Sequence, residues 1–329
     1  MFDKAELSDL AEFKFGHSQD REKATGCTVV IAPEGARCGV SIVGGGPATR
    51  ETDLLRPENM VQDIHAVVLA GGSAFGLEAS SGVMDALAKR SIGFSLMGIQ
   101  IPIVTGACLF DLTVGEFSYP DKSMGAKAVE HAFSNEKFEQ GNVGAGIGAS
   151  VGKILGPQHS MKSGFGYQVL RFDDLVVGAL VATNALGNVI DSYGQSIAGC
   201  INEKGELIES LEAFSSYVKD ASSHGTSSTV QAPTNTTLGI VVCNAKLDKG
   251  QATKVAAISN DAYARAIKPV HTSNDGDAIF TFASGKVDTL PDLVAIMATE
   301  AMEQAILNSV LYAESAYGLT AAPDLRIPK

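Results

Sequence analysis

The chain has 329 residues and a formal net charge of −12, with 45% hydrophobic and 19% charged residues. This composition is typical of a globular protein with a large buried core, and it excludes an intrinsically disordered chain. The negative charge argues against nucleic acid and anionic membranes as partners, because both are bound through basic surfaces.

The first β signal lies in residues 27–43. Residues 28–31 and 39–43 alternate in polarity, and Pro33-Glu34-Gly35 between them has the composition of a turn. This pattern predicts two strands that pair with each other through a turn at 33–35.

The rest of the chain alternates short apolar runs with helical patterns. The apolar runs predict strands at 66–70, 176–182, 238–242 and 278–283. Helices are predicted at 73–89, 124–135, 207–220, 250–268 and 291–316. Buried strands flanked by helices predict an α/β layered core, and we expect a single domain over residues 1–329.

Two segments are predicted to be loops. Residues 141–152 are dense in glycine, which allows a backbone to approach other groups closely. We expect this loop to lie against Thr236. Residues 222–236 are rich in Ser and Thr and predict a flexible connector that leads to Thr236.

Five cysteines are scattered along the chain and form no C-x-x-C pair: Cys27, Cys38, Cys108, Cys200 and Cys243. This pattern predicts reduced thiols in a cytoplasmic protein, and we expect no metal and no other cofactor. Residues 1–6 are charged and lack the apolar core of a signal peptide. No apolar run approaches the roughly 20 residues that span a bilayer, so no membrane partner is expected.

Two adjacent threonines, Thr236 and Thr237, stand where the polar connector meets the apolar run at 238–242. A hydroxyl at the start of a buried strand suits the nucleophile of a self-processing hydrolase. Cleavage between Asn235 and Thr236 would give Thr236 a free α-amino group, which can act as its own general base. Further downstream, Asp275-Gly276-Asp277 offers two carboxylates that could orient such a centre.

Six sequence blocks in this order resemble the self-cleaving aminopeptidases. That family includes the L-aminopeptidase/D-esterase, the β-peptidyl aminopeptidases and the nylon-oligomer hydrolase. The blocks are Arg50-Glu51-Thr52-Asp53-Leu54-Leu55, Gly71-Gly72-Ser73-Ala74-Phe75-Gly76-Leu77, Asn142-Val143-Gly144-Ala145-Gly146, Asn235-Thr236-Thr237, Pro269-Val270-His271-Thr272 and Asp275-Gly276-Asp277.

The resemblance implies a four-layer αββα fold, similar to that of the N-terminal-nucleophile hydrolases but with a different connectivity. It also implies a precursor that cuts itself into a long chain, 1–235, and a short chain, 236–329. The two chains are expected to stay associated and to form a homo-oligomer.

The same resemblance implies roles for individual residues. Thr236 matches the nucleophile, and Asn184, at the end of a central strand, matches the asparagine that stabilises the oxyanion. Asp275 and Asp277 match an acidic pair found in the nylon-oligomer hydrolases. Lys153 matches an active-site lysine of those relatives.

Two positions leave questions open. Lys162 is an alternative match for the active-site lysine. Phe110 stands where several members carry an active-site tyrosine, so the substrate class cannot be copied from any one relative. His271 is expected to have a structural role, because an N-terminal threonine supplies its own base.

The sequence thus predicts an aminopeptidase or amidase that acts on small peptides or amides with a free amino end through an acyl-enzyme on Thr236. Two alternatives remain. One is a self-cleaving acyltransferase of the ornithine-acetyltransferase kind, and the other is a non-catalytic relative that keeps the fold. Whether the substrate is an L-, D-, β- or ω-amino derivative stays open.

Overall fold

The computed structural model describes residues 2–134, 136–223 and 235–325. Most of its strands join one ten-stranded sheet in the order β1-β11-β12-β15-β17-β3-β5-β8-β4, with β2 also paired to β3. These strands are β1 (Asp3–Lys4), β2 (Lys14–Asp20), β3 (Thr25–Ile42), β4 (Ala48–Arg50), β5 (Asp63–Ala70), β8 (Val104–Cys108), β11 (Phe165–Phe172), β12 (Leu175–Asn184), β15 (Thr236–Ala245) and β17 (Ala278–Val287).

Five α-helices and three small sheets complete the described chain. The helices are α1 (Glu78–Lys89), α2 (Lys122–Ala132), α3 (Ser210–Ser223), α4 (Lys249–Ala266) and α5 (Pro291–Leu311). The small sheets pair β6 (Phe94–Leu96) with β7 (Ile99–Ile101), β9 (Ser150–Val151) with β10 (Met161–Lys162), and β13 (Asn188–Ile190) with both β14 (Ser196–Ala198) and β16 (Ile267–Lys268).

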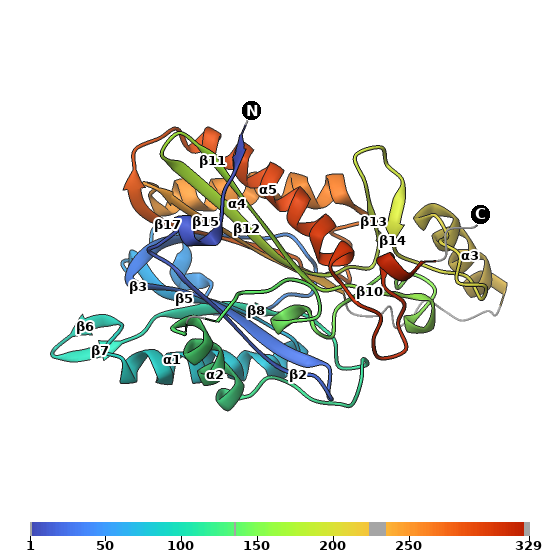
Figure 1. The fold of residues 1–329 in the computed structure, drawn as a ribbon, viewed down its shortest axis with the longest axis horizontal. Coiled ribbons are helices and arrows are strands. Elements are labelled where there is room, and N and C mark those ends of the chain that lie inside the picture. Colours follow the sequence, from blue (N-terminus) through green and yellow to red (C-terminus); the bar gives the residue numbers. More distant parts are fainter. Residues whose placement is uncertain (1, 135, 224–234, 326–329) are drawn as a thin grey trace.

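The long strand β3 divides the sheet into two stacked layers. Its first half pairs with β2 and β5, and its second half, from Arg37 to Ile42, pairs with β17. Helices α4 and α5 cover the layer that contains β11, β12, β15 and β17, whereas α1 and α2 cover the layer of β2, β5 and β8 (Figure 1). The predicted four-layer αββα fold is confirmed.

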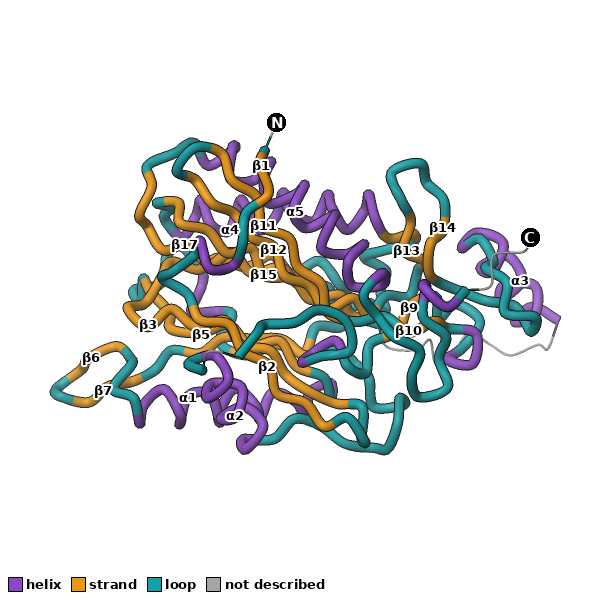
Figure 2. Tube along the Cα trace, in the orientation of Figure 1, coloured by secondary structure: helices purple, strands orange, loops and turns teal. Residues whose placement is uncertain are grey.

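Three hydrophobic cores hold these layers together. The first lies between α4, α5 and their sheet layer, and the third between α1, α2 and theirs. The second fills the space between the two sheet layers and includes Leu69 from one layer and Leu180 and Leu238 from the other. In Figure 2 these strand layers lie between the two helical layers, and β13, β14 and α3 extend from one end.

The predicted hairpin at residues 28–43 is wrong. Residues 25–42 form one continuous strand, and both parts of it pair with β5 on the same side. The pairing slips between Ile31 and Ala36, where Gly35 has a φ of +80°. Pro33-Glu34-Gly35 therefore forms a β-bulge, which re-aims the strand and lets its second half join β17.

The other predicted elements are present with shifted ends. The helix expected at 291–316 ends at Leu311, and the strand expected at 66–70 begins at Asp63. Most of the connector predicted at 222–236 falls in 224–234, outside the described residues. Within the described ranges, no helix has the length and apolar character needed to cross a membrane.

Candidate active site

Thr236 is the first residue of β15, a strand held between β12 and β17 at the centre of its layer. The antiparallel register places it directly opposite Asn184, the last residue of β12. Because successive strand residues point to opposite faces, Thr236 lies on the same face as Leu238, toward the core between the sheets. Thr237 lies on the opposite face, toward the helices.

The Thr236 hydroxyl lies against the peptide bond that precedes it. Its Oγ1 donates a hydrogen bond to the carbonyl oxygen of Asn235 over 2.5 Å. The same carbonyl oxygen accepts a second hydrogen bond from the backbone N–H of Gly276, at 2.7 Å. The side chain of Thr236 is only 3% exposed. A shielded hydroxyl therefore sits beside a carbonyl whose oxygen is already held by a backbone donor.

Asp275 and Asp277 flank Gly276 just before β17, the parallel neighbour of β15. Asp277 accepts the Thr237 N–H at 2.7 Å through Oδ1, and its Oδ2 lies 2.8 Å from Nδ1 of His271. Asp275 accepts the backbone N–H of Thr272 at 2.6 Å. Burial, together with the charge of Asp277, raises the pKa of Asp275. The structure thus brings both carboxylates to the start of β15 beside Thr236.

Asn184 is fully buried, and the atoms around it fix which way its amide faces. The side-chain Nδ2 donates to the carbonyl oxygen of Phe110 at 2.9 Å. The side-chain Oδ1 accepts from the Ser150 N–H at 3.1 Å and from Nζ of Lys153 at 2.6 Å. An amide nitrogen carries two hydrogens, so Nδ2 can make a second donation.

Lys153 belongs to this arrangement, and Lys162 has a different environment. Lys153 is 5% exposed, and its Nζ also donates to the main-chain oxygen of Asn184 at 3.1 Å. Burial lowers the pKa of Lys153 to about 7, although the charges of Asp275 and Asp111 oppose the shift. Nζ of Lys162 instead donates to backbone carbonyls, among them those of Gly146 and Ala149. Lys153 is therefore the lysine in contact with Asn184.

Asp111 is a buried carboxyl that the sequence motifs do not mark. Its Oδ1 accepts the backbone N–H of Gly72 at 2.6 Å, whereas Oδ2 has no hydrogen-bond partner within the described residues. Burial raises the pKa of Asp111 to about 7, against the charges of Lys153 and Lys162. The available signal was a charged residue three positions after the end of the apolar strand β8.

We expect the Asp111 carboxyl to lower the free energy of unfolding as the pH rises from about 4 to 7. The substitution Asp111→Asn should abolish this pH dependence. The folded-state pKa of about 7 exceeds the ordinary value of 3.8. In this window the folded chain holds a proton that the unfolded chain releases, so the free energy of unfolding falls as the pH rises. At 1.36 kcal/mol per pKa unit, the fall is up to about 4 kcal/mol.

The measurement is urea unfolding at pH 5, 6 and 7, with Thr236→Ala in both proteins to remove the hydroxyl at the predicted cleavage site. Burial lowers the pKa of Lys153 and Lys162 to about 7 as well, from 10.5. Their effect falls between pH 7 and 10.5, outside the tested range. Equal pH dependence in the two proteins would contradict the assignment to Asp111.

The glycines of the 141–152 loop were predicted to lie against Thr236, but in the structure Gly144 and Gly146 lie against other residues. A Cβ built on Gly144 would meet His17 and Thr28, and one on Gly146 would meet Phe165. The glycine that lies against Thr236 is Gly276, where an added Cβ would stand 2.7 Å from Oγ1. The glycine-dense loop instead approaches the site through Ser150, and Lys153 follows directly after the loop.

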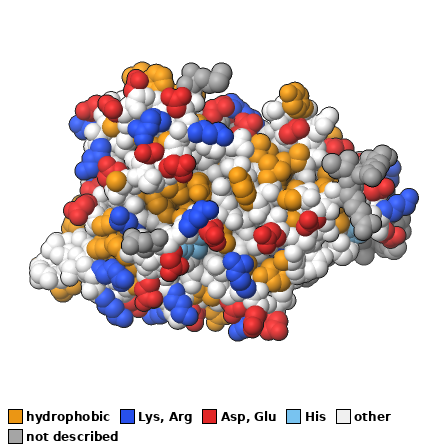
Figure 3. All heavy atoms as spheres, viewed as in Figure 1, with side chains coloured by type: hydrophobic (Ala, Val, Ile, Leu, Met, Phe, Trp, Pro, Cys, Tyr) orange, Lys and Arg blue, Asp and Glu red, His pale blue; other side chains and the backbone are white. Residues whose placement is uncertain are grey.

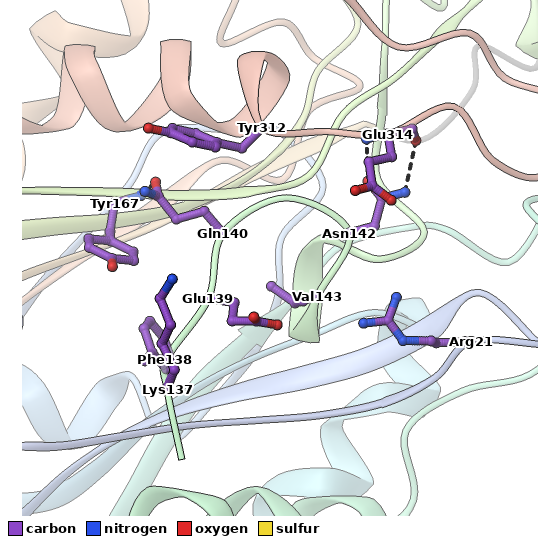
Figure 4. Close-up of a pocket in the computed structure, with 10 residues that line it drawn as sticks. All are labelled: Arg21, Lys137, Phe138, Glu139, Gln140, Asn142, Val143, Tyr167, Tyr312 and Glu314. Atoms are coloured by element: carbon purple, nitrogen blue, oxygen red, sulfur yellow. Dashed lines mark hydrogen bonds between the residues drawn. The ribbon is translucent and has the colours of Figure 1, made fainter. Parts of the chain in front are cut away.

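A separate pocket of about 350 Å³ opens near the start of that loop (Figure 4). It is lined by two cationic and two anionic side chains, Arg21, Lys137, Glu139 and Glu314, and by six further residues. None of the ten is a predicted site residue, so this pocket is distinct from the surroundings of Thr236. Within the described residues, no group of three or more His, Cys, Asp or Glu side chains could hold a metal ion.

Comparison with solved structures shows the same fold. A β-aminopeptidase from Burkholderia sp. superposes with a TM-score of 0.68 at 16% identity, covering 98% of this chain and 92% of that one. The L-aminopeptidase D-Ala-esterase/amidase from Ochrobactrum anthropi superposes with a TM-score of 0.67, also at 16% identity, over 94% and 88%. That enzyme is a prototype of the serine aminopeptidases and has a variant of the Ntn hydrolase fold.

Sequence comparison gives nearer relatives. The chain is 34% identical to an uncharacterized aminopeptidase of Mycobacterium leprae, over 95% of this chain and 92% of the relative. It is 30% identical to the 6-aminohexanoate-oligomer endohydrolase of Paenarthrobacter ureafaciens, over 85% and 75%. The sequence pattern of Peptidase family S58 matches residues 5–322. The resemblance found in the sequence is therefore confirmed, and this chain is a hydrolase of peptidase family S58.

Proposed function

We propose that the chain is a precursor that cuts itself between Asn235 and Thr236 and then acts as an N-terminal-threonine aminopeptidase or amidase. The observation that carries this proposal is the placement of the Thr236 hydroxyl on the carbonyl oxygen of Asn235, which the Gly276 N–H also holds. Nucleophile, target bond and a donor for the developing negative charge are thus adjacent in the uncut chain.

Self-cleavage begins when Oγ1 of Thr236 attacks the carbonyl carbon of Asn235. The C–N bond breaks, the nitrogen takes up a proton, and the acyl group moves from nitrogen to oxygen as an ester. Water then hydrolyses this ester, which leaves a carboxylate on Asn235 and a free α-amine on Thr236. During the attack the Gly276 N–H stabilises the oxyanion, because it already points at the oxygen on which charge develops.

Turnover uses the same hydroxyl on a substrate amide. The new α-amine, with an ordinary pKa of about 7.7–8.0, accepts the hydroxyl proton near neutral pH. Oγ1 attacks the substrate carbonyl, the amine product leaves, and water hydrolyses the acyl-enzyme. The remaining N–H of the Asn184 amide donates to the oxyanion, and Lys153 fixes the amide in that orientation. Asp275 and Asp277 orient the α-amino group of Thr236.

The substrate class follows from the relatives' names. One is an aminopeptidase and another a 6-aminohexanoate-oligomer endohydrolase. We therefore propose small peptides or amides with a free amino end as substrates.

Mass spectrometry of the denatured protein and an amide-hydrolysis assay together test the function. We expect two fragments, 1–235 and 236–329, and release of free acid from aminoacyl amides without an added acceptor. Release that requires an amine acceptor would indicate an acyltransferase. A chain that stays intact and inactive after long incubation would contradict the proposal and favour a non-catalytic relative.

Gly276→Ala is expected to slow self-cleavage by about 100-fold or more. The new Cβ would stand 2.7 Å from Thr236 Oγ1 and 2.9 Å from the carbonyl oxygen of Gly46, so the hydroxyl must move away from its target. A misplacement of about 1 Å can cost such a factor. The time course of fragment formation measures it.

Gly46→Ala is the matched control. It alters the neighbouring loop, but its Cβ would have 4.0 Å to the nearest atom, the main-chain oxygen of Asp275. Near-normal cleavage is expected for this variant. Equal rates in the two variants would show that the close approach at Gly276 is unimportant.

A further inference from the structure

The pocket of about 350 Å³ near the start of the 141–152 loop is walled by parts of both sheet layers. Arg21 follows β2 of one layer, and Tyr167 belongs to β11 of the other. Most of the remaining lining comes from residues 137–143, and Tyr312 and Glu314 follow the end of α5. The pocket is therefore built from four separate parts of the chain.

Hydrogen bonds through the main chain hold these walls in place. Nδ2 of Asn142 donates to the carbonyl oxygen of Glu314 at 2.8 Å, and the Glu314 N–H donates to Oδ1 of Asn142 at 3.2 Å (Figure 4). The backbone N–H of Tyr167 donates to Oε1 of Gln140 at 2.7 Å. Because these bonds occupy main-chain and amide groups, the charged side chains of the pocket remain available to a ligand.

The four charged side chains of the pocket, Arg21, Lys137, Glu139 and Glu314, do not pair with one another. Among the described residues, none of them takes part in an ion pair. In Figure 4 the carboxylate of Glu139 and the guanidinium of Arg21 point toward each other from the two sides of Val143. Opposite charges thus face a shared space without closing it.

A second pocket, of about 760 Å³, shows the contrasting arrangement. It lies at the far ends of β15 and β17, and two of its cations are paired with carboxylates of its own wall. Arg37 lies 2.6 Å from Asp63, and Lys246 lies 3.3 Å from Asp288. The cations of the larger pocket are thus mostly neutralised in place, whereas both cations of the smaller pocket are free to meet a ligand.

We propose that the smaller pocket binds a short zwitterion, an amino acid or peptide with a free ammonium and a free carboxylate. The ligand ammonium lies between the carboxylates of Glu139 and Glu314. The ligand carboxylate lies against Lys137 and Arg21, whose guanidinium can hold it through two parallel hydrogen bonds.

The size and the other walls of the pocket fit such a ligand. Small-molecule sites usually measure about 300–1,000 Å³, so this pocket suits a small ligand. At about 30 Å³ for each water-sized group, it has room for about 12 such groups, roughly a short peptide. The rings of Tyr167 and Tyr312 supply walls for the uncharged middle of the ligand.

The charges disfavour ligands of a single sign. An anion would meet the carboxylates of Glu139 and Glu314 on a chain whose net charge is −12. A cation without a carboxylate would leave Arg21 and Lys137 unpaired. Figure 3 shows acidic and basic side chains interspersed over the face drawn there, so recognition depends on the local arrangement of charges.

The pocket is separate from the candidate active site and does not depend on the proposed reaction. Asn142 and Val143 line the pocket, and the same loop reaches Asn184 only further along, through Ser150. Short peptides belong to the proposed ligand class, and the chain is a member of a peptidase family. The pocket thus holds a peptide at a place apart from Thr236.

The test is calorimetric titration of triglycine into the full chain with Thr236→Val, so that the proposed nucleophile cannot consume the probe. We expect the further changes Arg21→Gln and Glu314→Gln to weaken binding by about tenfold or more, because each removes a charged partner of the ligand. The control, Lys286→Gln with Glu34→Gln, removes one cation and one anion from the larger pocket and should leave binding unchanged. Equal affinities in the two variants, or no saturable binding up to about 10 mM, would overturn the proposal.

Two capped probes test the requirement for both charges. N-acetyl-triglycine lacks the ammonium and triglycine amide lacks the carboxylate, so each should bind about tenfold more weakly than triglycine. Equal binding of either capped probe would rule out a zwitterion site.

Protection of Lys137 from acetylation locates the bound probe. Mass spectrometry of proteolytic peptides gives the ratio of acetylation at Lys137 to that at Lys286, which cancels any reagent that triglycine itself consumes. Triglycine should lower this ratio. A ratio that triglycine leaves unchanged would place the probe elsewhere and overturn the assignment to this pocket.

Discussion

Replacing Thr236 by valine should leave a chain that neither cuts itself nor hydrolyses amides. The substitution keeps the shape of the side chain and removes only the hydroxyl, which lies 2.5 Å from the carbonyl oxygen of Asn235. Loss of a catalytic nucleophile typically lowers turnover by about 10⁴- to 10⁶-fold. Mass spectrometry follows the cleavage, and an aminoacyl-amide assay follows the hydrolysis.

Thr237→Val is the matched control, because it makes the same change one residue along the strand. The Thr237 hydroxyl is fully buried and has no hydrogen-bond partner within the described residues. Its removal should leave cleavage and hydrolysis intact, and Thr236→Ser should retain both at a reduced rate. Should Thr237→Val abolish cleavage while Thr236→Val does not, the nucleophile would be Thr237.

The overall layering could be predicted from the sequence because each strand and helix carries a local signal. Runs such as 176–182 are apolar throughout, which is typical of strands covered on both faces. The path of β3 could not be predicted in this way. Pro33-Glu34-Gly35 has the composition of a turn, and only the tertiary pairing of both halves with β5 makes it a bulge.

The candidate site, like the fold, could be predicted only in part from the sequence. Thr236, Asn184, Asp275 and Asp277 could be named because strand ends and family motifs mark them, and the structure brings them together with Lys153. Other groups of the site could not be named in this way, because they are main-chain atoms or because only their burial sets them apart. The Gly276 N–H and the Phe110 carbonyl are main-chain atoms, and Asp111 stands out only because it is buried.

Phe110 illustrates this limit. Several relatives carry a tyrosine at this position, and the sequence suggests only the loss of a hydroxyl. In the structure its main-chain oxygen accepts the Asn184 amide, a contact that any residue at position 110 could make. Phenylalanine in place of tyrosine therefore leaves the hydrogen bond to Asn184 unaffected. The substitution removes only the contacts that a tyrosine hydroxyl would make.

Asn184→Asp is the second substitution with a large expected effect, a fall in kcat of about 100- to 1,000-fold. It keeps the size of the side chain but replaces the Nδ2 donor with an oxygen. Losing one oxyanion donor typically costs about 2.7–4 kcal/mol in the barrier. The variant also loses the hydrogen bond from Nδ2 to the Phe110 carbonyl oxygen, whereas the Lys153 ammonium, 2.6 Å from Oδ1, offsets the added negative charge. Circular dichroism of the variant checks that the fold persists. Steady-state kinetics on the cleaved enzyme separates kcat from KM, and KM should change little.

The substitution Lys153→Met tests whether Lys153 acts only by orienting the Asn184 amide, which is the group that donates to the oxyanion. Within the described residues, Nζ of Lys153 donates to both oxygens of Asn184, and its charge also acts on Asp275. We infer that the main effect of Lys153 on the reaction passes through the Asn184 amide. We expect a loss of about tenfold in kcat for this variant, and no further loss when it is combined with Asn184→Ala, which removes the amide without burying a charge. Such non-additivity is the signature of two residues that act as one unit. If the two losses instead multiply, Lys153 contributes separately from the amide.

The outcome that would contradict the role of Asn184 is a kcat of Asn184→Asp within about threefold of normal. The oxyanion donor in turnover would then be another group. The Gly276 N–H is the next candidate, because it already points at the Asn235 carbonyl oxygen.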